Sequence, residues 1–181
     1  MANTCSTGIA IEGAKETLEK IFSVLKKAEK GEIDYWGGSI LRALGKEDVS
    51  ETGFYGGFAS VEDIQETKKE GIFVLRLGWE DKWTRGDFIE NLQELFPEIE
   101  IYWMAEEFGC GYWETNDINS KYFSDRFAVV SDEDWEYFET EEDMLNYLKE
   151  NFGIDSRDEI ESYNENNEDG NTVTVYECEE E

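Results

Sequence analysis

The sequence predicts an α+β fold built on an antiparallel sheet. Segments whose apolar residues alternate, as in strands, are separate from segments whose apolar residues recur at helical spacing. Strands and helices do not alternate regularly along the chain, as they would in a protein with a parallel sheet. Apolar residues make up 39% of the 181 residues and aromatic residues 14%, which is enough to form a hydrophobic core.

The first part of the chain contains the clearest elements. Residues 5–12 alternate and predict a half-buried strand, and residues 14–29 have the apolar spacing of an amphipathic helix. Residues 33–70 interleave glycines with aromatic residues, so we expect a loop-rich insertion with one short helix near residues 39–44. Residues 72–79 are almost continuously apolar and predict a strand that is covered on both faces.

A second helix is predicted over residues 85–96. Thr84 and Asp87 have the spacing of a capping box, and Pro97 ends the helix. Strands are expected at residues 98–107 and 121–130, with a turn or bulge over residues 108–113. Alternation along the strands turns one set of side chains toward the helices: Ile9, Ile11, Phe73, Leu75, Ile101 and Trp103.

The C-terminal part predicts two more helices and a last strand. Thr140 and Asp143 cap a helix that runs through Asn151, and Gly153 follows its end. A weaker helix is expected over residues 156–163, and a strand over residues 172–178.

Four short motifs together resemble one known family. They are the opening ANTCSTGIAIEG, the pair Trp79-x-x-x-Trp83, the helix end Leu95-Phe96-Pro97 with the strand Ile99-Glu100-Ile101, and the turn Glu106-Glu107-x-Gly109. Over residues 1–130 the chain resembles the YubB-like, ferredoxin-like domain of plasmid and phage proteins. The resemblance implies a ferredoxin-like split βαβ sheet with helices on one face and residence on a mobile element. That family has no established catalytic residues, so none is carried over.

Two regions are therefore expected. Residues 1–130 would form the ferredoxin-like domain, with the insertion at residues 33–70. Residues 131–181 depart from the family pattern and would form an acidic, helical C-terminal extension that packs on the same unit and ends in a strand.

Charge is the strongest functional signal. The chain has 45 Asp and Glu against 16 Lys and Arg, no histidine, and a net charge of -29. Such a surface repels nucleic acids and anionic membranes and attracts basic grooves of other proteins. We expect no direct binding to nucleic acid or membrane.

The sequence also predicts a cytoplasmic protein. No apolar run reaches the roughly 20 residues of a membrane span, and no leader pattern is evident. The odd number of cysteines suits reduced thiols.

Enzymatic chemistry has little support. The absence of histidine removes Ser-His-Asp and Cys-His mechanisms. Carboxylates at residues 132–136 and 139–143 could hold Mg²⁺ or Ca²⁺, but neither run has the spacing of a calcium loop. The glycine pairs lack phosphate-loop and dinucleotide spacing, and glutamates around Cys110 oppose a thiolate there. We predict no catalytic residue, no metal site and no cofactor.

A partner-binding surface is predicted instead. Trp79 and Trp103 suit the core, whereas Trp113 and Trp135 border acidic turns and suit interface anchors. The predicted partner-binding residues are Asp132, Glu133, Asp134, Trp135, Glu136, Tyr137, Glu139, Glu141, Glu142 and Asp143.

Three functions fit these observations. The first is a nucleic-acid mimic that inhibits a basic, nucleic-acid-binding host defence effector, such as a CRISPR nuclease or a restriction enzyme. The second is an accessory or structural interaction module whose acidity serves only solubility or a saline setting. The third is a carboxylate-metal-dependent hydrolase or nuclease.

Overall fold

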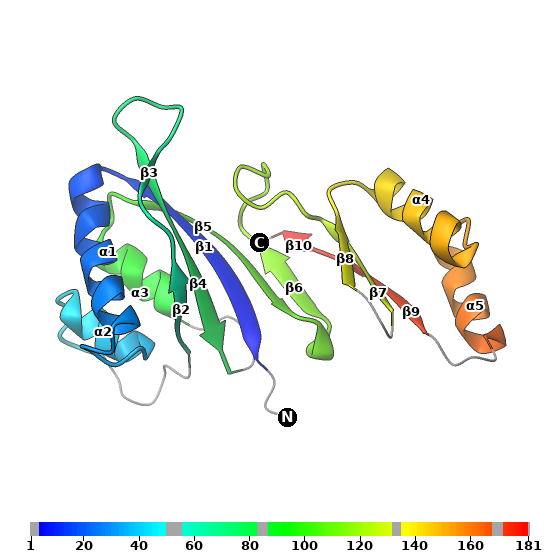
Figure 1. Ribbon diagram of the computed structural model, residues 1–181, viewed down its shortest axis with the longest axis horizontal. Helices are drawn as coiled ribbons and strands as arrows, with labels where there is room; N and C mark the ends of the chain where they lie inside the picture. The colour runs from blue at the N-terminus through cyan, green and yellow to red at the C-terminus, as the bar shows by residue number, and fades with distance from the viewer. Residues whose placement is uncertain (1–3, 50–55, 83–86, 132–134, 168–171, 181) are drawn as a thin grey trace. The chain divides into compact units, whose positions relative to one another are not determined.

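The chain folds into two compact units, Met1–Asn116 and Asp117–Glu181 (Figure 1). The computed structural model describes residues 4–49, 56–82, 87–131, 135–167 and 172–180. The mixed α+β class is confirmed. The expected boundary between Val130 and Ser131 falls inside a strand of the second unit, so the chain divides earlier than its charge pattern suggested.

The first unit is a sheet with helices packed against it, as Figure 1 shows. Its strands are β1 (Cys5–Gly13), β2 (Gly57–Val61), β3 (Gln65–Glu66), β4 (Phe73–Asp81), β5 (Glu100–Glu107) and β6 (Tyr112–Thr115). Its helices are α1 (Lys15–Glu29), α2 (Gly37–Ala43) and α3 (Phe88–Leu95), and a 3₁₀ turn, η1, covers Phe108–Cys110.

Neighbouring strands of this sheet are antiparallel, in the order β6-β5-β1-β4-β2, and β3 also pairs with β4. The register places Ile9 opposite Leu77 and Trp103, so one face presents a continuous apolar row to the helices. Of the six residues predicted to face the helices, five are buried, and Phe73 packs against the same core from a partly buried position.

The region 33–70 is more regular than we predicted. It contains β2 and β3 as well as α2. The Gly56-Gly57 pair lets the backbone approach close neighbours at the start of β2. A Cβ atom on Gly57 would lie 2.6 Å from the Tyr35 ring, so only glycine fits this start of β2. The expectation that residues 72–79 are covered on both faces is wrong at Arg76, which is exposed.

Helix α3, predicted over residues 85–96, begins later than expected. It starts at Phe88, and Asp87 precedes it without a side-chain capping bond. Thr84, the other half of the predicted capping box, lies outside the described residues. The ring of Phe88 stacks on Trp79 of β4 at 3.8 Å between centroids, which fixes the helix on the sheet.

The second unit has a sheet and a core of its own. It contains β7 (Phe127–Ser131), β8 (Trp135–Phe138), α4 (Glu141–Phe152), the 3₁₀ turn η2 (Arg157–Glu159), α5 (Ile160–Asn166), β9 (Val173–Glu177) and β10 (Glu179–Glu180). Strands β8, β7 and β9 pair antiparallel in that order. Val129, Met144, Leu148, Ile154 and Val173 form its core. Residues 131–181 were expected to extend the first domain, but here they pack around their own apolar residues.

The predicted strand over residues 121–130 is only partly correct. β7 begins at Phe127, and the preceding residues form a loop around Asp117. The buried Asp117 carboxylate accepts hydrogen bonds from the backbone N–H groups of Lys121, Tyr122 and Phe123 at 2.6–3.0 Å. The Asp117 side chain thus takes the place of a neighbouring strand as the acceptor for these three backbone N–H groups.

The caps of α4 are confirmed. Thr140 Oγ1 accepts from the N–H of Asp143, and Gly153 ends the helix in the left-handed conformation at φ 71°. None of the helices in the described ranges combines the length and the apolar character that a membrane crossing requires.

Candidate functional site

The predicted partner-binding residues that the structure describes lie along β8 and the start of α4. We call this surface the acidic–aromatic strip and define it as Trp135, Glu136, Tyr137, Glu139, Glu141, Glu142 and Asp143. All seven residues are exposed. Asp132, Glu133 and Asp134 were predicted to belong to the same surface and lie outside the described residues.

Strand alternation determines which side chains of β8 share a face. Phe138 is partly buried in the core of the second unit and packs on Tyr147, with 5.2 Å between ring centroids. Because side chains alternate along a strand, Trp135 and Tyr137 stand on the face opposite to the helices. They are 49% and 38% exposed, which are large fractions for aromatic residues. They offer apolar area within a charged surface.

The acidic residues at the start of α4 have different local roles. Glu141 Oε1 lies 3.0 Å from Arg157 Nε, so its charge is partly neutralised within the unit. Asp143 takes part in the cap, where the Thr140 hydroxyl donates to its carboxylate at 2.6 Å. All three carboxylates of this first turn, including Glu142, lie at the positive end of the helix dipole, which stabilises them.

The second unit cannot neutralise its own charge. It contains 22 Asp and Glu against four Lys and Arg, a net charge of -18, while the first unit carries 23 against 12. The four basic side chains already have contacts inside the unit. Lys121 lies over the Tyr122 ring, Arg126 bonds three backbone carbonyls, and Lys149 and Arg157 pair with carboxylates.

Mutual repulsion between carboxylates is visible next to the strip. Partial burial raises the pKa of Asp125 above its ordinary value, and the nearby Glu139 raises it further, while Arg126 opposes both. A cation brought close to Glu139 would relieve this repulsion. The strip is therefore suited to receive positive charge.

The structure confirms the two tryptophans that were predicted to lie in the core and contradicts the prediction for Trp113. Trp79 and Trp103 are buried in the core of the first unit. Trp113 was predicted to be an interface anchor, but it is only 2% exposed and cannot serve as one. Trp113 and Thr115 are the two buried residues of β6, so their side chains point to the same, inner face of the strand. The acidic residues beside Trp113 in the sequence therefore do not indicate that it is exposed.

The thiols are not arranged for nucleophilic chemistry. Burial raises the pKa of Cys5 to about 11, although a hydrogen bond with Thr7 lowers it in part. The negative charges of Asp81, Glu107 and Glu106 raise the pKa further. This thiol stays protonated at neutral pH. Cys110 is exposed, and its Sγ donates to Glu107 Oε1 at 3.2 Å.

Across the described ranges, no three His, Cys, Asp or Glu side chains gather in a way that could hold a metal ion.

Sequence reasoning missed two residues that organise the second unit. Asp117 holds the loop before β7, and Arg157 links Glu141 at the start of α4 to Glu177 at the end of β9. Asp117 has the residue type that initiates turns, which is a weak signal. The role of Arg157 depends on tertiary contacts and leaves no local signal.

No family model, no curated protein and no solved structure matches this chain. The likeness to the YubB-like family therefore stays a prediction.

Proposed function

We propose that this chain is a non-enzymatic binding protein that imitates the negative charge of a nucleic acid and occupies the basic site of a nucleic-acid-binding protein. The observation that carries the proposal is the charge of the second unit. Its four basic side chains have contacts inside the unit, and its 22 carboxylates greatly outnumber them. A partner with dense Lys and Arg would supply the missing positive charge.

Charge density makes a nucleic-acid-binding partner the best match. Duplex DNA carries one charge per roughly 1.7 Å of its axis, so proteins evolved for it present closely spaced Lys and Arg. An ordinary protein surface mixes both signs of charge and would repel this unit in part. The proposed role is inhibition, since a protein that fills such a site excludes the nucleic acid.

In the proposed complex, the aromatic residues of the acidic–aromatic strip make the binding specific. Charge alone gives fast association that salt weakens, whereas a desolvated aromatic centre slows dissociation. Trp135 and Tyr137 stand together on one face of β8, with Glu136 between them in the sequence. We assign them the role of anchors.

The fold of the first unit supports the suggested origin. Apart from the short α2 and β3, its elements follow in the order β1, α1, β2, β4, α3, β5 and β6, and the first six of these have the β-α-β-β-α-β succession expected of a ferredoxin-like fold. This agrees with the resemblance to plasmid and phage proteins. On a mobile element, an inhibitor of this kind would act on a host defence effector, such as a CRISPR nuclease or a restriction enzyme.

Binding kinetics of strip variants test the proposal on a partner captured from a host lysate. We expect Glu136→Gln, Glu139→Gln and Glu142→Gln, combined in one variant, to slow association and to flatten its salt dependence. Trp135→Ala is expected to speed dissociation by about tenfold or more, as loss of an aromatic hot spot does. Glu141 and Asp143 are left unchanged because each has a role inside the unit.

A matched control removes the same charge elsewhere. Glu62→Gln, Asp63→Asn and Glu66→Gln change three exposed carboxylates of the first unit, and they should leave both rates nearly unchanged. Equal effects of the two triple variants would contradict a defined binding strip and favour the alternative, an accessory module whose acidity serves solubility.

A further inference from the structure

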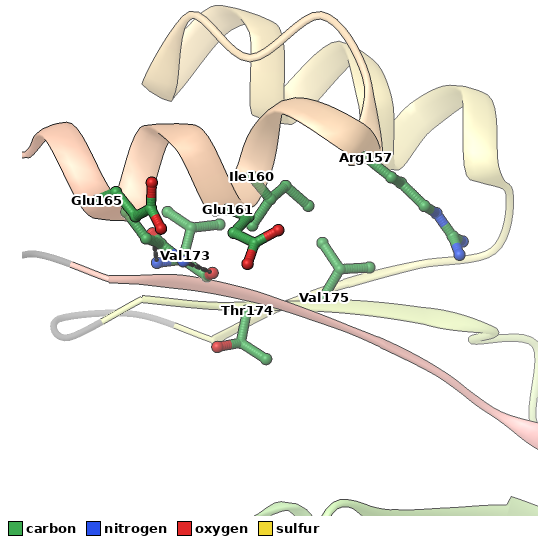
Figure 2. Close-up of a pocket in the computed structure, with 8 residues that line it drawn as sticks. Arg157, Ile160, Glu161, Glu165, Val173, Thr174 and Val175 are labelled. Atoms are coloured by element: carbon green, nitrogen blue, oxygen red, sulfur yellow. Dashed lines mark hydrogen bonds between the residues drawn. The ribbon is translucent and has the colours of Figure 1, made fainter.

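An open groove of about 690 Å³ lies between α5 and β9 in the second unit. Ile160, Val173 and Val175 give it an apolar floor, and Glu161 and Glu165 line it from α5. Figure 2 shows Val173 and Val175 pointing toward α5, while Thr174 points to the other side of the strand. Because residues from both sides of β9 line the groove, it opens along the edge of the sheet.

The backbone of β9 faces this groove. The N–H of Cys178 donates to the carbonyl of Arg126, one step beyond the paired residues of β7 and β9, so Cys178 and every second residue before it in β9 turn their N–H groups toward β7. Residues at odd positions of β9 therefore turn their N–H and C=O groups away from β7. Within the described residues β9 is an edge strand, in the order β8-β7-β9.

One position of this edge is already occupied. The side-chain amide of Asn164 accepts from the N–H of Val173 at 2.8 Å and donates to its C=O at 2.9 Å. These are the two bonds that a neighbouring strand would make. Asn164 thus ends the open edge at Val173, and Val175 is the next residue whose backbone groups point outward.

The charge of the groove selects its occupant. Glu161 and Glu165 are four residues apart on α5, so both lie on the face that lines the groove. Arg157 at its end is held by Glu141 and Glu177 at 3.0 and 2.9 Å, and it adds little free positive charge. A cationic occupant is therefore favoured.

We propose that β9 accepts an extended basic peptide segment as an added strand. The backbone of the peptide would pair with Val175, and alternate Lys or Arg side chains would face α5. Their aliphatic stems would cover Ile160 and Val175 while their charges reach Glu161 and Glu165. This second binding surface goes beyond the proposed function and uses different residues from the acidic–aromatic strip.

Peptide binding to the full-length protein tests this directly. The probe is a labelled, end-capped octapeptide of alternating lysine and valine, measured by fluorescence anisotropy. We expect it to bind, and the same peptide methylated on its four central backbone nitrogens to bind about tenfold more weakly or not at all, because the methyl groups remove strand-pairing donors without changing the charge. A peptide of alternating glutamate and valine should not bind.

Variants of the groove complete the test. Val175→Pro removes an outward N–H without breaking the ladder to β7, and Glu161→Gln with Glu165→Gln removes the two carboxylates. Each is expected to weaken binding by about tenfold, whereas the control pair Glu150→Gln and Asp158→Asn should not weaken it.

Equal binding of the methylated peptide, or an equal loss in the control pair, would overturn the proposal in favour of unspecific charge attraction. Absence of binding by the lysine–valine peptide would also overturn it. If Val175→Pro does not fold, the methylated peptide and the glutamate pair still decide the question. None of these results bears on the strip.

Discussion

At the scale of single residues, Asp125 shows what the charge of the second unit does locally. Its carboxyl group is partly buried near Glu139, and both features raise its pKa above the ordinary value of 3.8. Since the folded state holds this proton more tightly than the unfolded state, ionisation of Asp125 destabilises the fold at neutral pH. The destabilisation is absent below pH 3.8 and develops as the pH rises through the raised pKa.

Asp125→Asn is therefore expected to increase the free energy of unfolding at neutral pH. Because the group is only partly buried, solvent screening keeps the gain below about 1 kcal/mol. The gain should shrink as the pH falls and vanish under acidic conditions. Urea denaturation at several pH values measures it. Asp158→Asn removes the same charge from an exposed site, so an identical pH-dependent gain in that variant would contradict a specific role of Asp125.

At the scale of elements, α4 positions three of the seven residues of the acidic–aromatic strip. Its N-cap is the bond from the N–H of Asp143 to Thr140 Oγ1, at 3.2 Å. The three carboxylates of the first turn depend on this cap for their arrangement.

Thr140→Ala should lower the free energy of unfolding by about 1 kcal/mol, the usual cost of losing an N-cap side chain. Urea denaturation followed by circular dichroism measures the loss. Ser156→Ala is the matched control, because Ser156 precedes the 3₁₀ turn η2 without making a capping bond. A loss of the same size in both variants would show that the cap of α4 adds nothing specific.

The elements also show what the sequence could predict. The first helix and α4 follow from regular apolar spacing and local caps, and the structure confirms them. The strands β2 and β3 were missed because they are short and rich in exposed or glycine residues. Residues 121–126 were predicted to be part of a strand, but they form a loop. The hydrogen bonds to Asp117 that shape this loop depend on the three-dimensional structure, so the sequence does not reveal them.

The sequence also predicts the candidate site only in part, because some of its features are local and others depend on tertiary packing. Acidic and aromatic residue types locate the strip, and alternation explains why Trp135 and Tyr137 share a face. The pairing of Glu141 with Arg157 could not be foreseen, because their contact depends on how α4 and η2 pack. The groove of α5 and β9 depends on strand register, which the sequence leaves open.

At the scale of the whole molecule, the charge is unevenly divided. The second unit carries a net charge of -18 and the first -11, although the second is the shorter of the two. Each unit has a hydrophobic core of its own, so the carboxylates of the second unit are not needed to hold the first together. This division is consistent with one unit that provides a scaffold and one that presents charge.

The most direct test of nucleic-acid mimicry is competition for a captured partner. The partner, immobilised at low salt, is saturated with this protein, and a short DNA duplex is added in increasing concentration. If the protein occupies the nucleic-acid site, the duplex displaces it completely, and the concentration needed rises in proportion to the concentration of the protein. Simultaneous binding of duplex and protein to the partner, with no displacement, would contradict the account.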